Sequence, residues 1–168
     1  PSYSLTRAQA ATILWRYFQP TASKNYNAQA ATNRTKMADV ESGCFYTEAA
    51  NWAVENGVIH GVEKDGELCF DPDASIPREQ LCVMIANAAH ELCGRSVEGA
   101  SRAKLEAMPD VQSVPEWASD SIAWCLNEGV VNGVDENGTR YVEPASIVDR
   151  ATMAQIMVNA IDAEALSR

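Results

Sequence analysis

The six residues SLTRAQ at positions 4–9 decide the fold, because the chain repeats them in altered form as SIPREQ at 75–80 and IVDRAT at 147–152. Apolar residues follow each copy at spacings of three, four, seven or eight, which is the pattern of a helix with one buried face. These apolar positions are Ala10, Ile13, Leu14 and Phe18; Leu81, Met84, Ile85, Ala88 and Leu92; and Met153, Ile156, Met157, Ala160 and Ile161. The pattern predicts three amphipathic helices.

An arginine leads each of these helices, namely Arg7, Arg78 and Arg150. The residue before each arginine is of a type that favours a helix start, and Thr6 with Gln9 predicts a capping box. A cation at this end opposes the helix macrodipole by about 0.3–1 kcal/mol. Because this unfavourable placement occurs three times at one register, the three arginines are candidates for a binding site.

A longer unit surrounds the second and third arginines. Residues 37–93 contain an Asp-Val step, a predicted helix at 45–56, a Gly-Val-Ile-x-Gly segment, an acidic-Pro step and the Arg78 helix. Residues 108–168 repeat this order, with a predicted helix at 117–128. The matching positions lie 72 residues apart: Trp52 and Trp124, Gly57 and Gly129, Gly61 and Gly133, Pro72 and Pro144, Arg78 and Arg150. One supersecondary unit is therefore used more than once.

The repeat spacing also indicates which parts of the remaining chain are repeats and which are connectors. Arg78 lies 71 residues after Arg7, so residues 1–19 are predicted to be the second half of a first repeat. Its first half is expected upstream or from another chain. The polar segment at 20–36 and the segment at 94–107 are predicted to be connectors. Since Gly57 and Gly129 suit left-handed helix ends and residues 64–66 and 136–138 suit tight turns, the expected fold class is all-α.

The ordered set of motifs resembles the S-layer homology (SLH) family, over about two and a half repeats. TRAQ at 6–9 is similar to the family's Thr-Arg-Ala-Glu signature, and the copies at 77–80 and 149–152 keep the arginine. The resemblance implies tandem helix-loop-helix repeats in a pseudo-threefold bundle, with binding grooves between neighbours. It also implies non-covalent anchoring of an exported bacterial protein to the cell wall, through an acidic secondary wall polysaccharide that is commonly pyruvylated.

The resemblance further implies a set of glycan-binding residues. They are Arg7, Arg78 and Arg150; Trp52 and Trp124; Asp39 and Asp110; and Gly61 and Gly133. At a helix start, free N–H groups and an arginine would together suit a carboxylate.

Each candidate also has a structural explanation. The arginines could pair with internal carboxylates, the two tryptophans could lie in the core, and the two aspartates could cap helices. The two glycines could be needed for positive φ alone. Phe45 and Trp117 share the helical spacing of the tryptophans and are predicted to be mainly core residues.

Composition argues against several classes of protein. A net charge of −10 argues against a nucleic-acid partner. There is no apolar run of about 18 residues for membrane insertion and no visible signal peptide. The five cysteines include no C-x-x-C pair, and Cys82 and Cys93 would lie roughly 16 Å apart on one helix, so buried or unpaired thiols are favoured over a disulfide framework.

No catalytic or metal-binding motif is present, so neither an enzyme activity nor a cofactor or metal is expected. The Asp- and Gly-containing turns do not have EF-hand spacing. Together with the family resemblance, which implies the anchoring role, this leads us to expect an extracellular wall-anchoring module whose partner is the polysaccharide. The alternatives are a structural module that packs against partner chains, including self-association through the incomplete first repeat, or a tether for an enzyme encoded elsewhere in the protein.

Overall fold

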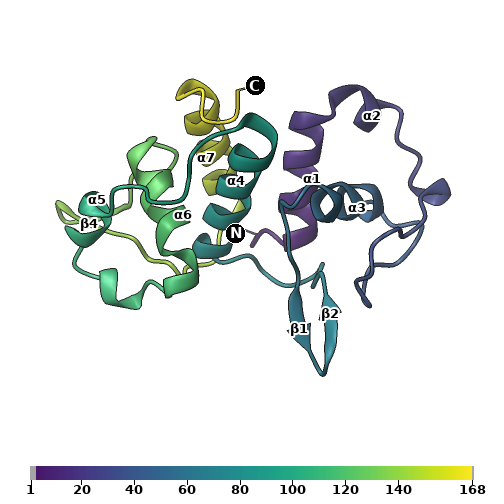
Figure 1. The fold of residues 1–168 in the computed structure, drawn as a ribbon, viewed down its shortest axis with the longest axis horizontal. Helices are drawn as coiled ribbons and strands as arrows, with labels where there is room; N and C mark the ends of the chain where they lie inside the picture. Colours follow the sequence, from purple (N-terminus) through teal and green to yellow (C-terminus); the bar gives the residue numbers. More distant parts are fainter. Residues whose placement is uncertain (1–2, 168) are drawn as a thin grey trace. The chain divides into compact units, whose positions relative to one another are not determined.

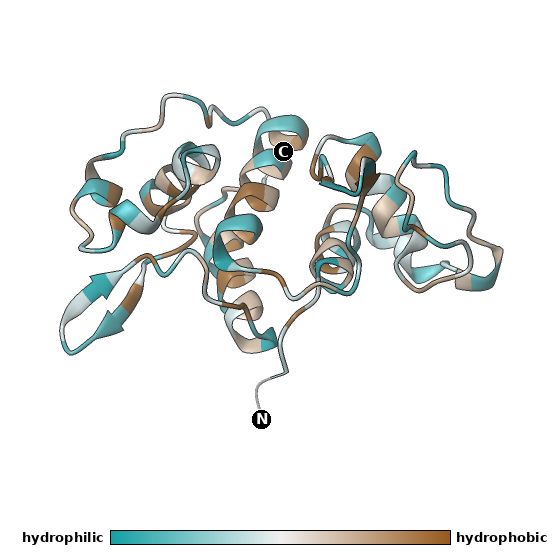
Figure 2. Ribbon diagram, turned by 90° about the horizontal axis from the view of Figure 1, so that it is seen from below, coloured by the Kyte–Doolittle hydropathy of each residue, from teal (hydrophilic) through white to brown (hydrophobic). Residues whose placement is uncertain are grey.

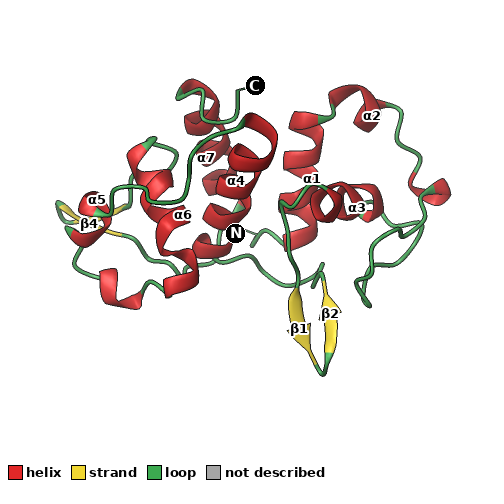
Figure 3. Cartoon of the chain, in the orientation of Figure 1, coloured by secondary structure: helices red, strands yellow, loops and turns green. Residues whose placement is uncertain are grey.

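The computed structural model describes residues 3–167, which form two compact units (Figure 1). One unit is Leu5–Ser75, and the other consists of the residues from Ile76 onward together with the described residues before Leu5. Helices dominate both units, and each unit contains a short two-stranded hairpin (Figure 3).

The unit Leu5–Ser75 is built on the packing of two helices, α1 and α3. Its elements are α1 (Arg7–Phe18), α2 (Pro20–Lys24), the 3-10 helix η1 (Ala28–Ala30), α3 (Thr47–Glu55), β1 (Val62–Lys64) and β2 (Glu67–Cys69). The rings of Phe18 on α1 and Trp52 on α3 stack with centroids 5.8 Å apart. Leu14 and Phe70 are fully buried in the same unit.

The other unit is built on the packing of α4 against α6. Its elements are α4 (Arg78–Cys93), α5 (Ala103–Glu106), η2 (Val111–Ser113), α6 (Glu116–Asn127), β3 (Val134–Glu136), β4 (Thr139–Tyr141) and α7 (Arg150–Asp162). Leu81, Ile85 and Ile122 are fully buried. Figure 2 shows apolar and polar positions alternating along the helices, as expected for helices with one buried face.

The three arginine-led helices are confirmed, and so is the capping box at the start of α1. Thr6 Oγ1 accepts a hydrogen bond from the Gln9 backbone N–H, and Gln9 Oε1 accepts one from Thr6. Gly57 and Gly129 have φ of +68° and +75°, the left-handed conformation expected where the helices end.

The expectation of an all-α chain is wrong in one respect, because the predicted turns are the tips of antiparallel hairpins. β1 pairs with β2, and β3 pairs with β4. Asp65 and Gly66 at one tip, and Asn137 and Gly138 at the other, all have positive φ, as a type I′ turn requires. Strands of three residues are too short to show the alternating pattern by which a strand is predicted.

Phe45 and Trp117, predicted to be mainly core residues, are exposed by 52% and 59%. Phe45 precedes the first residue of α3, so it does not share a helical face with Trp52. Trp117 lies in the first turn of α6, outside the buried set of that helix. Both aromatic side chains thus remain available on the surface of their own unit.

The residues at 20–36 and 94–107 contain short helices and are not featureless connectors. α2 and η1 lie in the first segment and α5 lies in the second. None of the helices described within residues 3–167 is long and apolar enough to cross a membrane.

Candidate functional site

The three arginines predicted as site residues lie in three different environments. Arg7 is only 6% exposed, and its Nε donates a 2.8 Å hydrogen bond to the Phe70 carbonyl oxygen. Its guanidinium carbon lies 5.9 Å from the centroid of the Phe70 ring, a cation–π contact. Burial lowers the pKa of Arg7, against the opposing influence of Asp71 and Asp39. Arg7 is held inside its unit.

Arg78 is half-buried, and its Nε is buried without a hydrogen-bond partner among the described residues. It lines a cavity of about 450 Å³ with residues of the β3–β4 hairpin and the segment before α7. The other lining residues are Ser4, Val134, Glu143, Ser146, Ile147, Val148, Asp149 and Thr152. A buried guanidinium N–H without an acceptor is costly, so this cavity suits an incoming acceptor.

A sequence difference between the repeats explains why Arg7 contacts an aromatic ring and Arg78 does not. The main-chain N–H of Arg7 donates to Ala74, and that of Arg78 donates to Ser146, which is 72 residues further on. The two arginines therefore start from equivalent backbone positions. The position that corresponds to Phe70 is Val142, which offers no aromatic face on which a guanidinium could lie.

The acidic groups beside Arg78 already have partners. Glu143 Oε2 accepts a 2.8 Å hydrogen bond from the Ser146 hydroxyl. Asp149 Oδ1 accepts one of 2.7 Å from the Thr152 backbone N–H, and this bond holds the pKa of Asp149 below its ordinary value. Neither carboxylate accepts a hydrogen bond from the Arg78 Nε. The third arginine, Arg150, is exposed at the start of α7.

The expected free N–H groups at the helix starts are largely occupied. In α1, Arg7 N donates to Ala74 and Ala8 N donates to Pro72, while Gln9 N donates to Thr6. In α4, the first two N–H groups likewise donate to carbonyl oxygens of 146 and 144. An anion at these helices would therefore be bound by the arginine side chain and not by the helix end itself.

Asp39 and Asp110 form the same structural contact in the two repeats. The two carboxylate oxygens of Asp110 accept 2.8 Å hydrogen bonds from the backbone N–H groups of Val142 and Glu143. Those of Asp39 accept bonds of 2.6 and 2.7 Å from residues 70 and 71. Asp71 and Glu143 both have positive φ. Each aspartate thus fixes the strained exit of a hairpin.

The aromatic candidates are Trp52 and Trp124, and both are buried. Their core interpretation agrees with this placement. The exposed Phe45 and Trp117 occupy positions 72 residues apart, and Phe45 lines a cavity of about 600 Å³ with Asp39, Asp71 and Asp73 among others. This 72-residue recurrence was the sequence signal by which the exposed pair could have been found.

Gly61 and Gly133 have positive φ and lie against their own hairpins. A Cβ on Gly133 would lie 2.9 Å from the Tyr141 carbonyl oxygen, and one on Gly61 would lie 3.0 Å from that of Cys69. A Cβ at Gly133 would force the backbone to shift, and one at Gly61 would press on the hairpin backbone, so the positive φ and the close approach together favour glycine at both positions.

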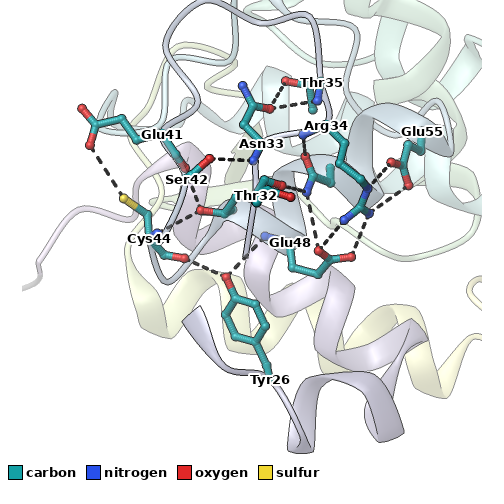
Figure 4. Close-up of polar contacts among 12 residues, drawn as sticks. Tyr26, Thr32, Asn33, Arg34, Thr35, Glu41, Ser42, Cys44, Glu48 and Glu55 are labelled. Carbon is teal, nitrogen blue, oxygen red and sulfur yellow. Dashed lines mark hydrogen bonds and ion pairs between the residues drawn. The ribbon is translucent and has the colours of Figure 1, made fainter. Parts of the chain in front are cut away.

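Two further arginines, which the sequence reasoning overlooked, fasten the segments that were predicted to be connectors. Arg34 forms a bidentate pair with Glu48 at 2.9 Å and a second pair with Glu55 at 3.1 Å (Figure 4). Arg102 pairs with Glu116 at 3.0 Å and Asp120 at 2.7 Å. In both repeats the first glutamate lies 14 residues after the arginine. That shared spacing was a readable signal.

We expect Arg34→Ala to loosen its segment far more than it lowers global stability. The Arg34 side chain is 46% exposed, and pairs at such sites contribute about 1 kcal/mol or less. Limited proteolysis within 25–36 should therefore become several times faster, while the thermal midpoint falls by only a few degrees. Arg16→Ala, an exposed arginine on α1, is the matched control, and equal proteolysis of both variants would contradict the assignment.

Within residues 3–167 no cluster of three or more His, Cys, Asp or Glu side chains is arranged to hold a metal ion. What the arrangement offers is a partly buried guanidinium, hydroxyl groups and repeated exposed aromatic rings. This is the chemistry of a binding module.

The geometry thus defines a tandem repeat protein in which each full repeat is a helix, a hairpin and an arginine-led helix. The family model of the S-layer homology domain matches residues 107–154, and this segment is an SLH domain. Residues 37–93 repeat its motifs at the constant spacing described above.

Curated proteins show distant similarity over 162 residues, which is 96% of the chain. They include the surface-layer 125 kDa protein of Lysinibacillus sphaericus (26% identical), the amylopullulanase of Thermoanaerobacterium thermosulfurigenes (27%) and the exoglucanase XynX of Acetivibrio thermocellus (25%). The matched region is 12%, 8% and 13% of these proteins, so the chain spans about a tenth of their length.

Proposed function

We propose that this chain is a non-catalytic cell-wall anchoring module at the bacterial cell surface, and that it binds an acidic, pyruvylated wall polysaccharide. The observation that carries the proposal is the buried, unpartnered Nε of Arg78 beside a cavity of about 450 Å³. Support for the surface location comes from the SLH domain at 107–154 and from the similarity to a surface-layer protein.

A pyruvate ketal presents a carboxylate, which a guanidinium binds through charge-assisted hydrogen bonds. In the Arg78 cavity the carboxylate would bind the guanidinium of Arg78, whose Nε has no hydrogen-bond partner among the described residues. Ser146, with Glu143 and Asp149, lies close by for the sugar hydroxyls. The protein carries a net charge of −10, so its overall field is unfavourable for an anionic sugar. The positive charge of Arg78 must overcome this field, which makes Arg78 the dominant contributor to anion binding.

The remaining candidates take graded roles in this proposal. Arg150, which is exposed, is a second anion-binding group, whereas Arg7 serves mainly to hold its unit together. Phe45 and Trp117 take the sugar-stacking role expected of Trp52 and Trp124. Asp39, Asp110, Gly61 and Gly133 shape the hairpins beside the binding surfaces.

We also propose the pseudo-threefold arrangement that the family resemblance implies. Its support is a set of three isolated backbone bridges between the segments that precede the arginine-led helices. In each bridge, the residue just before one arginine pairs with the residue three positions before another arginine. The bridges are Thr6 to Ser75, Pro77 to Ile147 and Ser4 to Asp149.

Retention on purified wall sacculi tests the glycan proposal. Arg78→Ala should weaken binding by about 10- to 100-fold, because a hydrogen bond to a charged group contributes about 1.5–3 kcal/mol. Arg16→Ala removes the same charge elsewhere and should leave binding within about twofold. Sacculi stripped of pyruvate should lose wild-type binding to the same extent. Unchanged retention of an Arg78→Ala, Arg150→Ala double variant would refute the proposal and favour a module that packs against partner chains or itself.

The cargo of such an anchor is proposed to lie outside this chain. Two of the relatives are named as enzymes, an amylopullulanase and an exoglucanase, and the matched region is a small part of each. An enzyme joined to these repeats is therefore a specific alternative to a surface-layer polypeptide. Sequencing the complete gene distinguishes the two.

A further inference from the structure

Two thiols meet in the core between α4 and α6. Cys82 is 1% exposed and Cys125 is 0% exposed, and both belong to the same unit. Sγ of Cys125 lies 3.7 Å from the backbone carbonyl oxygen of Cys82. Burial raises the pKa of the Cys125 thiol, and the neighbouring Cys82 side chain raises it further.

The other cysteines are placed differently. Cys44 and Cys69 belong to the Leu5–Ser75 unit, and Cys93 lies on α4 itself, eleven residues after Cys82. On a straight helix that separation is about 16 Å, too far for a bond. Cys125 contacts Cys82, so Cys93 lies a similar distance along α4 from Cys125 as well, and Cys82 with Cys125 is the pair that can join α4 to α6.

We propose that Cys82 and Cys125 form a disulfide when the chain folds in an oxidising medium, which would staple α4 to α6. The oxidant is a small-molecule disulfide. One cysteine thiolate attacks it and releases a thiol, and the second cysteine then displaces the other half. The protein loses two protons and two electrons, and the oxidant takes them up to become two thiols. This site is separate from the Arg78 cavity, which neither cysteine lines.

Burial decides when the bond can form. A thiol that is fully covered and held in its neutral form is a poor nucleophile, so oxidation of the folded protein should be slow. During folding both cysteines are accessible, and the packing of α4 on α6 then brings them together. The disulfide is thus a feature acquired on folding, comparable to those of other exported proteins.

Refolding from denaturant in a glutathione/glutathione disulfide buffer tests the proposal. Non-reducing peptide mapping should show a single major cross-link, joining the peptides of Cys82 and Cys125. The oxidised protein should melt about 5–15 °C higher than the reduced protein, as a disulfide closing a loop of this size allows. In the native reduced protein these two thiols should resist an aromatic disulfide reagent until the chain is unfolded.

Variants keep the test decisive. Cys82→Ser should abolish both the cross-link and the rise in melting temperature, whereas Cys93→Ser, on the same helix, should leave both unchanged. If Cys82→Ser does not fold, the wild-type peptide map alone decides the question. Cross-links scattered among the cysteines, or none between these two, would overturn the proposal, as would an oxidised protein no more stable than the reduced one.

Discussion

Replacing Asp110 with alanine is expected to lower the free energy of unfolding by about 3 kcal/mol. Both carboxylate oxygens accept hydrogen bonds from backbone N–H groups, those of Val142 and Glu143. A hydrogen bond to a charged group contributes about 1.5–3 kcal/mol, and its loss leaves the donor unsatisfied. The second donor is the backbone N–H of Glu143, whose φ of +48° is unfavourable for a residue with a side chain. The variant therefore also loses the hydrogen bond that stabilises this backbone conformation.

Chemical denaturation of Asp110→Ala and Asp110→Asn measures this effect. The asparagine variant should lose less, because one carbonyl oxygen still accepts while its NH₂ group faces the other donor. Asp162→Ala, at the exposed end of α7, removes the same charge and should change stability by less than about 0.5 kcal/mol. A loss at Asp110 no larger than the loss at Asp162 would contradict the structural role.

Gly133→Ala is expected to cost about 3 kcal/mol, well above the cost of Gly129→Ala. Both glycines have φ near +75°, at +74° and +75°, so both substitutions pay for a left-handed backbone, about 1–2 kcal/mol. Only at Gly133 does the new Cβ also meet the Tyr141 carbonyl oxygen at 2.9 Å, and backbone cannot move aside cheaply. Nothing lies within 4 Å of a Cβ at Gly129.

The difference between these two variants isolates the contact from the dihedral cost. Thermal unfolding of both, measured side by side, should show a drop several degrees larger for Gly133→Ala. Hydrogen exchange should be accelerated in the β3–β4 hairpin of that variant and not in the Gly129 variant. Equal destabilisation would mean that the hairpin yields to the extra methyl group, and that positive φ alone explains Gly133.

The helical part of this fold could be predicted because its signals are local. Apolar residues at helical spacing and the pairing of Thr6 with Gln9 determine where α1 begins, whatever surrounds it. The hairpins escaped prediction because three-residue strands carry too few positions for a pattern. The prediction that Phe45 and Trp117 are core residues is wrong because Phe45 precedes α3 and Trp117 lies in the first turn of α6, and helical spacing does not reveal what packs over a helix start.

The sequence indicates which positions carry the arginines of the candidate site, but not what surrounds each arginine side chain. Arg7 and Arg78 begin equivalent helices, yet one is docked on an aromatic ring and the other lines a cavity. The ring that contacts Arg7 belongs to Phe70, more than 60 positions away, and the equivalent position in the next repeat is Val142. Side-chain direction over such distances is decided by tertiary contacts, which a single sequence does not report.

The ion pairs of Arg34 and Arg102 have a consequence for how such modules can be recombined. Each arginine forms an ion pair with the first helix of the repeat that follows it. The last residues of the connector are therefore structurally part of that repeat. A chimera made by exchanging repeats should join the two parents upstream of these arginines, before residue 32 or residue 101. A junction at the Asp-Val step would separate α3 from Arg34 or α6 from Arg102, and the acidic side chains of that helix would lose their ion pairs.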